Sequence, residues 1–381
     1  MEPSPKVALV YCEDYQPEAV RRAIKAGIDL LGGAAQFVRP SEKILVKPNV
    51  LVGENPEKCI GPHPLVFQAV LEQLQAAGAQ VSFGDSPGFG SPRAGMRQAG
   101  LLTVADQLGV PLADFETPVT RAFPGGNLIK QFSLAKGVVE CDGLVSLSKL
   151  KSHALTRITG AIKNQFGCIP GVLKAEFHSR LPTADLFSKM LVDLNLLIRP
   201  RLYIMDGIVA MEGNGPRNGT PRPMHVLLFS TDPVALDATV CRLVNLDEKL
   251  VEPLVYGNQF GLGSSKNMTL LGDPIERFIV PDFNVNRSHA STSTNIGMLT
   301  NPIVRNLFTP RPVINAEACT RCGRCEQVCP AQPKALTWAN GKKQPPVYNY
   351  DHCIRCYCCQ ELCPHEAITV KTPLLGRLLR R

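Results

Sequence analysis

The feature that most constrains this chain is a cysteine pattern that occurs twice near its C-terminal end. The pattern reads C-x2-C-x2-C-x3-C-P, over residues 319–330 and again over residues 353–364. Three thiols at such short intervals belong to one loop, so each copy gathers its side chains around one point. We therefore expect this part of the chain to fold around a metal centre or a set of disulfides, and the spacing decides which.

The spacing favours two [4Fe-4S] clusters over zinc or disulfides. Three thiolates of such a loop bind three irons of one cube, and the fourth cysteine reaches across to a second cube. Zinc takes four ligands per ion, which accounts neither for the third cysteine at this interval nor for the closing Cys-Pro. Disulfide scaffolds are small and secreted, whereas this chain has 381 residues and begins without an export signal.

The two copies are similar beyond their cysteines. Residues 312–319 match residues 346–353, and residues 335–337 match residues 367–369 once two extra residues in the first copy are allowed for. Such self-similarity indicates a duplicated unit of strand, cysteine loop with helix, and second strand.

Residues 312–371 resemble the bacterial-type two-cluster ferredoxin domain, an α+β fold of the βαββαβ type. The resemblance implies that the clusters exchange ligands between the two copies. On this basis the first cluster is bound by Cys319, Cys322, Cys325 and Cys363, and the second by Cys329, Cys353, Cys356 and Cys359. Cys358 falls outside both sets, and its role as a plain thiol, an alternative ligand or a redox group stays open.

The part of the chain before this repeat is predicted to be an α/β body. Short apolar segments at residues 6–11, 43–46 and 79–83 alternate with helical segments at 17–31 and 64–77, which end at glycines. Strands that alternate with helices in this way favour a doubly wound, mostly parallel sheet.

Further strands are predicted at residues 143–147, 201–205 and 224–229, with a hairpin-like pair within 117–132. Residues 100–115 suggest a helix followed by a strand. After the last of these elements the pattern fades into small polar residues and prolines, which indicate a linker. We thus predict a body at 1–283, a linker at 284–311, the two-cluster domain at 312–371 and a basic tail at 372–381.

Charge and hydropathy exclude some classes of protein. The formal charge is +8, and two oxidised cubes with their thiolates bring it to roughly +4 over a large surface, which is no nucleic-acid signature. No apolar run is long enough to span a membrane, so we expect a cytoplasmic protein. The tail places Arg377, Arg380 and Arg381 among leucines, and a solvated terminus is favoured over contact with a membrane surface or partner.

Polar side chains follow several of the predicted strands. In an open parallel sheet, ligands bind outside the carboxyl ends of the strands. A single lysine or aspartate at such a place is ordinarily a solvated loop residue or a helix cap, so it is their repetition that indicates a shared crevice. The residues are Lys47, Asn49, Asp85, Ser86, Lys149, Lys151, His153 and Asp206.

Two segments have unusual compositions. Residues 149–171 contain three lysines and a histidine among glycines and no acidic residue, which favours binding of a carboxylate or phosphate. Residues 206–216 are rich in glycine and carry two carboxylates, which suit acid–base chemistry or a metal held with His153 or His63. Neither segment matches a Walker or GxGxxG motif, so no nucleotide is predicted.

Five short motifs resemble the bacterial and archaeal family called domain of unknown function 362. They lie at residues 47–49, 84–88, 149–153, 160–164 and 205–216. The resemblance covers about residues 40–245, and fusion to a two-cluster ferredoxin is common in that family, whose reaction is unsettled. Residues 159–178 are more faintly similar to a stretch of the nickel-pincer lactate racemases, an analogy only.

These observations give a leading hypothesis and an alternative. The leading one is an iron-sulfur oxidoreductase that passes single electrons between its clusters and an anionic substrate or cofactor in the body, and that exchanges electrons with a redox partner protein. The alternative is a non-enzymatic ferredoxin-like carrier, or an assembly factor, whose body docks a partner. Predicted catalytic residues are Lys151, His153, Lys163 and Asp206, and predicted cofactor-binding residues are Lys47, Asn49, Asp85, Ser86 and Lys149. Any further small-molecule or metal cofactor stays open.

Overall fold

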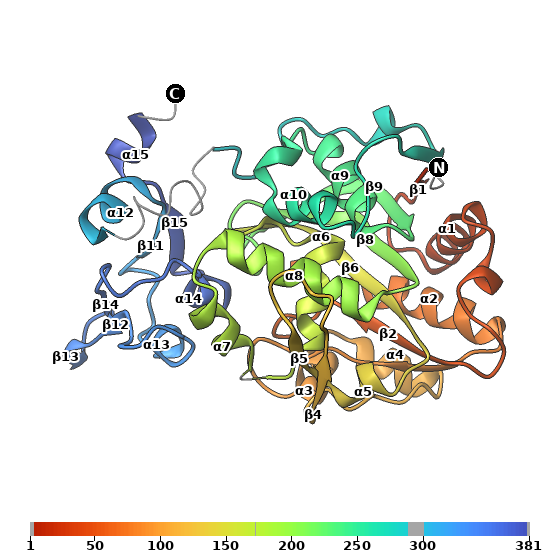
Figure 1. Cartoon of the computed structure of the whole chain (residues 1–381), viewed down its shortest axis with the longest axis horizontal. Coiled ribbons are helices and arrows are strands. Elements are labelled where there is room, and N and C mark those ends of the chain that lie inside the picture. The colour runs from red at the N-terminus through yellow and green to blue at the C-terminus, as the bar shows by residue number, and fades with distance from the viewer. Residues whose placement is uncertain (1–3, 172, 289–300, 379–381) are drawn as a thin grey trace.

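The computed structural model describes residues 4–171, 173–288 and 301–378. Two parts lie next to each other along the long axis of the molecule (Figure 1). We call residues 4–288 the body and residues 311–371 the cysteine-rich domain. Among the described residues, no helix is both long and apolar enough to cross a membrane.

The body is built on an eight-stranded sheet in the order β10-β1-β9-β8-β6-β2-β3, with β7 paired to β6. Neighbouring strands are parallel, except that β9 is antiparallel to β1 and β8, and β7 is antiparallel to β6. The predicted mostly parallel sheet is therefore confirmed. Its strands are β1 (Lys6–Tyr11), β2 (Lys43–Pro48), β3 (Gln80–Phe83), β6 (Gly143–His153), β7 (Arg157–Ile158), β8 (Leu202–Glu212), β9 (Thr220–Ser230) and β10 (Thr269–Gly272).

Helices cover both faces of this sheet because alternate strand residues point to opposite sides. In β1, Val7 and Leu9 enter one apolar core, whereas Ala8 and Val10 enter the other. The core with Ala8 packs against α1 (Pro17–Leu30), α2 (Pro64–Ala76), α3 (Pro92–Gln98) and α4 (Leu101–Gln107). The core with Val7 packs against α5 (Lys136–Val139), α6 (Gly160–Asn164), α7 (Leu173–Arg180), α8 (Ala184–Ile198), α9 (Pro233–Leu243) and α10 (Glu252–Gln259).

Two strands are much longer than predicted. β6 continues to His153 and β8 to Glu212, so residues 149–153 and 206–212, expected as loops, are largely strand. The strands keep pairing because Lys149 is the register partner of Asp206, and a buried ion pair there offsets the burial of both charges. A register shift between Gly207 and Val209 lets β9 follow β8 over the same length.

Two smaller expectations had different outcomes. The hairpin-like pair is present as β4 (Pro118–Ala122) and β5 (Gln131–Ala135), which are antiparallel. The strand expected at the end of residues 100–115 is wrong, since Leu112 forms only an isolated bridge with Phe83.

In the cysteine-rich domain the strands of the two copies pair with each other. β11 (Arg311–Ile314) pairs with β15 (Ile368–Lys371), and β12 (Leu336–Thr337) pairs with β14 (Val347–Tyr348), both antiparallel. Each pair therefore joins one strand from each copy. The remaining elements are α13 (Arg324–Gln327), β13 (Ala339–Lys342) and α14 (Cys358–Glu361).

The segments predicted as linker and tail are only partly described. The linker region includes α12 (Pro302–Phe308), and its residues 289–300 lie outside the described residues. The tail region includes α15 (Leu374–Leu378), and residues 379–381 with Arg380 and Arg381 likewise lie outside.

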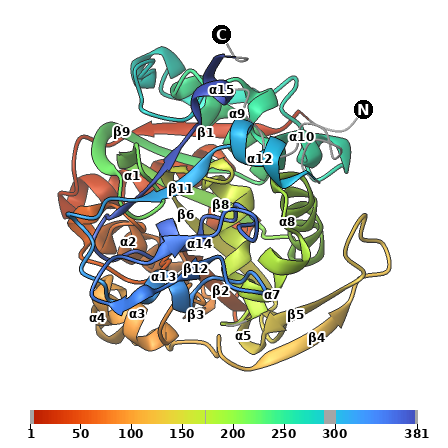
Figure 2. The ribbon, with the colours of Figure 1, turned by 90° about the vertical axis from the view of Figure 1, so that its left-hand side faces the viewer.

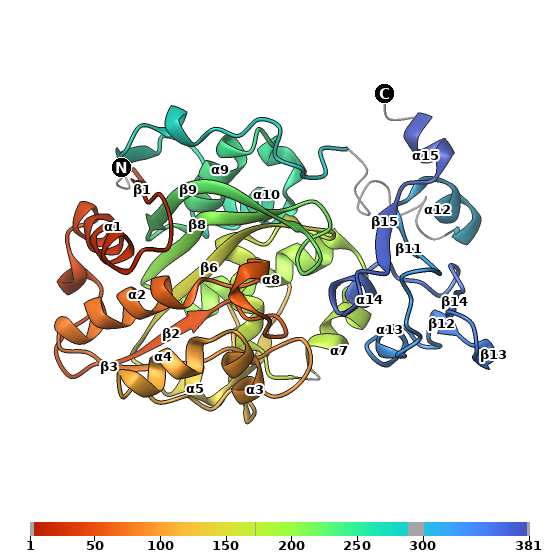
Figure 3. The same cartoon turned by 180° about the vertical axis from the view of Figure 1, so that it is seen from behind.

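The cysteine-rich domain turns α14 toward the body. Figures 1 and 3 show α14 next to the body and β13 at the far end of the molecule, and Figure 2 looks at the molecule from the cysteine-rich side. The apolar clusters of the two parts share no residue among those described. The contact between them is therefore an interface between separate cores.

Candidate functional site

Lys47 and Asp85 form a buried ion pair at the carboxyl ends of β2 and β3. Lys47 Nζ lies 2.8 Å from Asp85 Oδ1 and donates to Asn164 Oδ1 at 2.8 Å. Gly167 packs directly on the pair, since a Cβ at this position would lie 1.8 Å from Asp85 Oδ1. The pair holds the end of β2 against the segment that follows α6.

Lys149 and Asp206 form a second buried pair, on neighbouring strands. Lys149 Nζ lies 2.9 Å from Asp206 Oδ2, and it donates to the hydroxyl of Tyr15, which in turn donates to Asp206 Oδ1 at 3.1 Å. The backbone N–H of His63 donates to the same carboxylate at 2.9 Å. Burial opposes the charge of Lys149, but Asp206 outweighs it and raises the pKa of Lys149 above its usual value. These partners hold Lys149 and Asp206 within the protein.

Lys151 lies two residues further along β6 and so shares a face with Lys149. Its ammonium donates to the carbonyl oxygen of Ile60 at 2.6 Å. Burial, together with the nearby charge of Lys163, lowers the pKa of Lys151 well below its usual value.

His153 ends β6 and meets the cysteine-rich domain. Its Nδ1 accepts the backbone N–H of Leu155 at 3.0 Å, which leaves the proton of the neutral ring on Nε2. Nε2 lies 3.1 Å from Oε1 of Glu361, on α14. Burial and then Lys163 lower the pKa of His153 to about 4, so the ring is neutral at pH 7. Burial opposes the charge of Glu361, but His153 and Lys163 lower the pKa of Glu361 to about 2.

Lys163 differs from the other lysines because it has no hydrogen bond or ion pair to any of the described residues. It lies on α6, which begins at Gly160 with φ +63° and whose first N–H groups donate to the carboxylate of Asp237. The ammonium lies 5.9 Å from the ring centroid of Phe166. Burial lowers the pKa of Lys163, and Glu361 opposes that effect. Lys163 is thus a partly buried cation without a fixed partner in the described part of the chain.

This cation faces a cavity of about 390 Å³ between the body and the cysteine-rich domain, which we call the interdomain cavity. The cysteine-rich wall comes from the ends of α13 and α14 and includes Cys358 and Glu361. Two buried oxygens of the lining lack a partner among the described residues. They are Asn49 Oδ1 and Thr159 Oγ1. Apolar walls are provided by Leu51, Phe89, Phe166, Val328 and Leu362.

Lys174 also lines the interdomain cavity and was not among the predicted residues. Its ammonium donates to the carbonyl oxygens of Ser86 and Pro87, and burial lowers the pKa of Lys174 to about 7. The one local sign of its role in the sequence is that Lys174 comes three residues after the basic segment 149–171. Glu361 was missed as well, because it occupies a variable position inside the cysteine pattern and meets His153 only through the tertiary fold.

The structure divides the predicted body residues into two groups. Asn49, Asp85, Ser86 and Lys163 line the interdomain cavity. Lys47 lies directly behind Asp85, and Lys151 and His153 reach the same region through Lys163 and Glu361. Lys149 and Asp206 instead form the network with Tyr15.

Polar contacts fasten α14 and the residues after it to the body. Gln360 Nε2 donates to Asn214 Oδ1 at 2.8 Å, Arg217 Nη1 donates to the carbonyl of Leu362 at 3.0 Å, and Asn218 Nδ2 donates to the carbonyl of Cys363 at 3.2 Å. The second glycine-rich segment therefore contributes to the interface. Among the described residues of the body, no group of three His, Cys, Asp or Glu side chains is arranged to hold a metal ion.

The cysteines of the repeat lie near one another in overlapping groups. Cys319, Cys322, Cys325 and Cys363 line one small hollow in the cysteine-rich domain. Cys329 packs with Cys353 in one apolar cluster and also packs against another that contains Cys325, Cys359 and Cys363. Burial raises the pKa of Cys329, and the neighbouring Cys356 and Cys353 raise it further. Cys363 thus lies with the first set, and Cys329 with members of the second. The thiols present in each set therefore fit [4Fe-4S] ligation.

Comparison with known families accounts for both parts of the chain. Residues 44–242, more than half of its length, match the family model described as domain of unknown function (DUF362). The chain belongs to the DUF362 family. Residues 311–364 match a 4Fe-4S dicluster domain, so the DUF362 body is joined to an iron-sulfur domain of the ferredoxin type. Such a domain gives the protein an iron-sulfur electron-transfer role.

Two similar proteins extend this comparison. This chain is 35% identical over 257 residues to the thylakoid-associated protein sll1697 of Synechocystis sp.. The aligned residues cover 67% of this chain and 79% of that protein. The lactate racemase apoprotein from Thermoanaerobacterium thermosaccharolyticum aligns with a TM-score of 0.43 and 11% identity, over 63% of this chain and 56% of the racemase chain. At that TM-score the likeness supports no inference about the DUF362 body.

Proposed function

We propose that the protein passes single electrons between two [4Fe-4S] clusters and an anionic molecule bound in the interdomain cavity. The observation that carries this proposal is the position of the cavity. Lys163 of the body lines one wall, and Cys358, between the second-cluster ligands Cys356 and Cys359, lines the other. A molecule in this cavity lies against both an unpaired cation and the loop of a redox centre.

The clusters, when bound, would supply single electrons. The chain's own residues bind and orient the acceptor. Lys163 attracts an anionic group at the place where no internal partner neutralises it. Asn49 Oδ1 and Thr159 Oγ1 offer hydrogen-bond acceptors, and the hydroxyl of Thr159 also offers a donor.

The lining favours a small carboxylic acid with an apolar part over a highly phosphorylated metabolite. Phe89, Phe166 and Leu362 provide apolar contact and exclude water. The ionisable groups of the lining include Lys163, Lys174 and the carboxylates of Asp85 and Glu361, and Asp85 is already paired with Lys47. A phosphate with two negative charges would meet the Glu361 carboxylate as well as the lysines. A volume of about 390 Å³ suits a ligand of small-metabolite size.

The test is to purify the protein anaerobically with its clusters and measure ligand-induced thermal shifts with aliphatic and aromatic monocarboxylates and with phosphorylated metabolites. Lys163→Met should leave the cluster EPR signals unchanged and weaken carboxylate binding by about 10- to 100-fold, because a hydrogen bond to a charged group is lost. Lys266→Met, at an exposed lysine, serves as the matched control.

Reduced protein mixed with a carboxylic acid that binds and also carries a one-electron acceptor, such as a quinone ring, should lose its reduced-cluster signal in the parent and control, because the electron moves from a cluster to that ring. The loss should be slow in Lys163→Met. Equal binding and equal reoxidation by all three proteins would contradict the proposal. A binding acid that never oxidises the clusters would instead favour a carrier or assembly factor that senses the acid.

A further inference from the structure

The two cysteine sets differ in how far solvent reaches them. Cys322 of the first set is exposed, whereas Cys353 and Cys359 of the second are buried. The second loop is covered on one side by the body, through Glu361 and Gln360, and on another by α12. A protein of ordinary size therefore approaches the first set more closely than the second.

Cations surround the exposed part of the first loop. Arg321, Lys342 and Lys343 are exposed, and none of them forms an ion pair within the described residues. Arg321 Nη1 donates to the carbonyl of Lys343 at 3.1 Å, which ties the cysteine loop to the segment after β13. Lys342 Nζ would lie 3.4 Å from a Cβ added at Gly323, so it lies over the same loop.

Few carboxylates offset these charges. The carboxylate of Glu326, in α13, accepts a hydrogen bond from the indole N–H of Trp338 at 2.6 Å. Two exposed carboxylates lie close in sequence to cysteines of the first set: Glu317, before Cys319, and Glu366, after Cys363. Together with Arg324, the loop and its neighbours carry four cations against the carboxylates of Glu317, Glu326 and Glu366, so the side chains of the rim sum to one positive charge.

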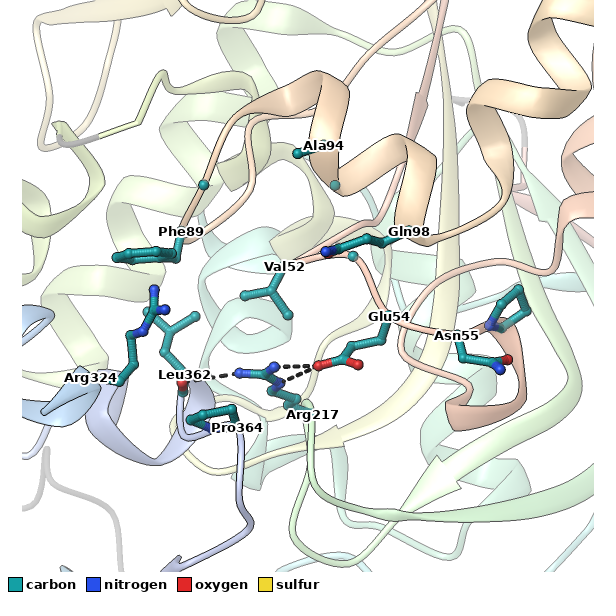
Figure 4. A pocket seen from close by; sticks show the side chains of 14 residues that line it. Val52, Glu54, Asn55, Phe89, Ala94, Gln98, Arg217, Arg324, Leu362 and Pro364 are labelled. Atoms are coloured by element: carbon teal, nitrogen blue, oxygen red, sulfur yellow. Dashed lines mark hydrogen bonds and ion pairs between the residues drawn. The ribbon is translucent and has the colours of Figure 1, made fainter. Parts of the chain in front are cut away.

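A groove continues this rim onto the body (Figure 4). It has a volume of about 680 Å³ and is lined by Val52, Glu54, Phe89, Gln98, Arg217 and Arg324. The guanidinium carbon of Arg324 lies 3.3 Å from the ring centroid of Phe89, which is 42% exposed. Arg217 is paired with Glu54 and donates to the carbonyl of Leu362. The groove therefore offers an aromatic and a cationic wall beside the ligand positions Cys322, Cys325 and Cys363.

We propose that this surface, Arg321, Arg324, Lys342 and Lys343 with the adjoining groove, docks an acidic redox protein. One electron moves from the reduced centre of that partner to the first cluster, and no covalent bond is formed or broken. The inference goes beyond the anion site, because it concerns entry of electrons at the opposite end of the cluster pair. It is carried by charge complementarity together with exposure of Cys322.

The experiment follows reduction of the full, cluster-loaded protein by stopped-flow absorbance. The probe is a reduced, strongly acidic plant-type [2Fe-2S] ferredoxin, and photoreduced deazariboflavin is the small uncharged donor. The test variant is Arg321→Glu with Lys342→Glu and Lys343→Glu. The control variant, Arg22→Glu with Lys249→Glu and Lys266→Glu, makes the same change of net charge at exposed body cations.

In the parent, the rate at which the acidic ferredoxin reduces the clusters should fall at least about tenfold between about 20 and about 300 mM salt. Salt screens the electrostatic attraction that brings the two proteins together. At low salt the test variant should be slower by a similar factor, whereas the control variant should match the parent. Deazariboflavin should reduce all three proteins at one rate.

A parent rate that does not change with salt would overturn the proposal, and this measurement needs no variant. So would an unchanged rate in the test variant, or equal slowing in the control variant. Because deazariboflavin reports on the clusters and thermal shift reports on the interdomain cavity, failure here is distinguishable from failure of the proposed anion site.

Discussion

Lys174 is the residue whose protonation most directly links the cavity to stability. It is 8% exposed, and burial lowers the pKa of Lys174 from 10.5 to about 7. Between these two pH values the unfolded chain binds a proton that the folded chain does not, so the free energy of unfolding rises with pH. The slope for one proton is at most about 1.4 kcal/mol per pH unit, and below pH 7 both states are charged and the slope vanishes.

Lys174→Met should therefore flatten the rise of Tm between pH 7 and 9, measured anaerobically on the cluster-loaded protein. Other buried lysines, Lys151 and Lys163, keep contributing in the variant, so the difference between variant and parent isolates Lys174. Lys266→Met, which removes an exposed lysine, should retain the parent's slope. Identical slopes in parent and Lys174→Met would mean that Lys174 keeps its ordinary pKa.

At the residue scale, the sequence predicted the part of the site that local pattern determines. Residues after strands were recognisable because apolar strands and glycines bracket them, and this found Asn49, Asp85 and Ser86. Glu361 could not be found in this way, since its importance depends on a contact with His153 across 208 positions of chain. The pairing of Lys149 with Asp206 was hidden for the same reason.

At the element scale, each short helix of the cysteine-rich domain precedes a cysteine that lies with the other copy's set. Cys329 follows α13 and packs with Cys353, and Cys363 follows α14 and lies with Cys319. Cys329→Ala should therefore damage the second cluster and largely spare the first. Iron and sulfide analysis should show loss of up to one cube, and EPR should show which one.

Cys358→Ala is the matched control for that variant. Cys358 lies on α14 between two predicted ligands but belongs to neither set, so this change should keep both clusters. Loss of only the cluster at Cys319, Cys322 and Cys325 in Cys329→Ala would contradict the crossed ligation.

The extended strands show what pattern reading misses at this scale. Lysine, histidine and aspartate are poor candidates for a sheet interior, so β6 and β8 were expected to end at residues 147 and 205. The ion pair between Lys149 and Asp206 on neighbouring strands offsets the cost of burying these two charges, and both strands continue past it. The duplicated domain was predictable because its repeat lies within one short stretch of sequence.

At the scale of the whole molecule, the two parts keep separate cores and meet through mainly polar contacts. Each apolar cluster lies wholly within one part, and the interface contacts involve Gln360, Glu361 and Arg217. The separate domains were therefore predictable from sequence, but their docking was not. The fit between α14 and the body surface that it contacts depends on two folded surfaces, and no local sequence pattern encodes it.

A chain ended after residue 288 should fold as a colourless body, because both of its cores are complete without the cysteine-rich domain. It should show native circular dichroism and a cooperative thermal transition. The truncated body keeps Lys163 but loses the wall that includes Val328, Cys358 and Leu362, so the carboxylate-induced thermal shift of the full protein should shrink or vanish.

A smaller thermal shift could come from loss of the cation or from loss of the cysteine-rich wall. Lys163→Met in the full chain separates the two, because that variant keeps the wall and loses the cation. An insoluble or molten truncated body would show that the two parts depend on each other to fold. A truncated body with the full thermal shift would show that the ligand binds to the body alone, and the interdomain cavity would then not be the site where electrons leave the clusters.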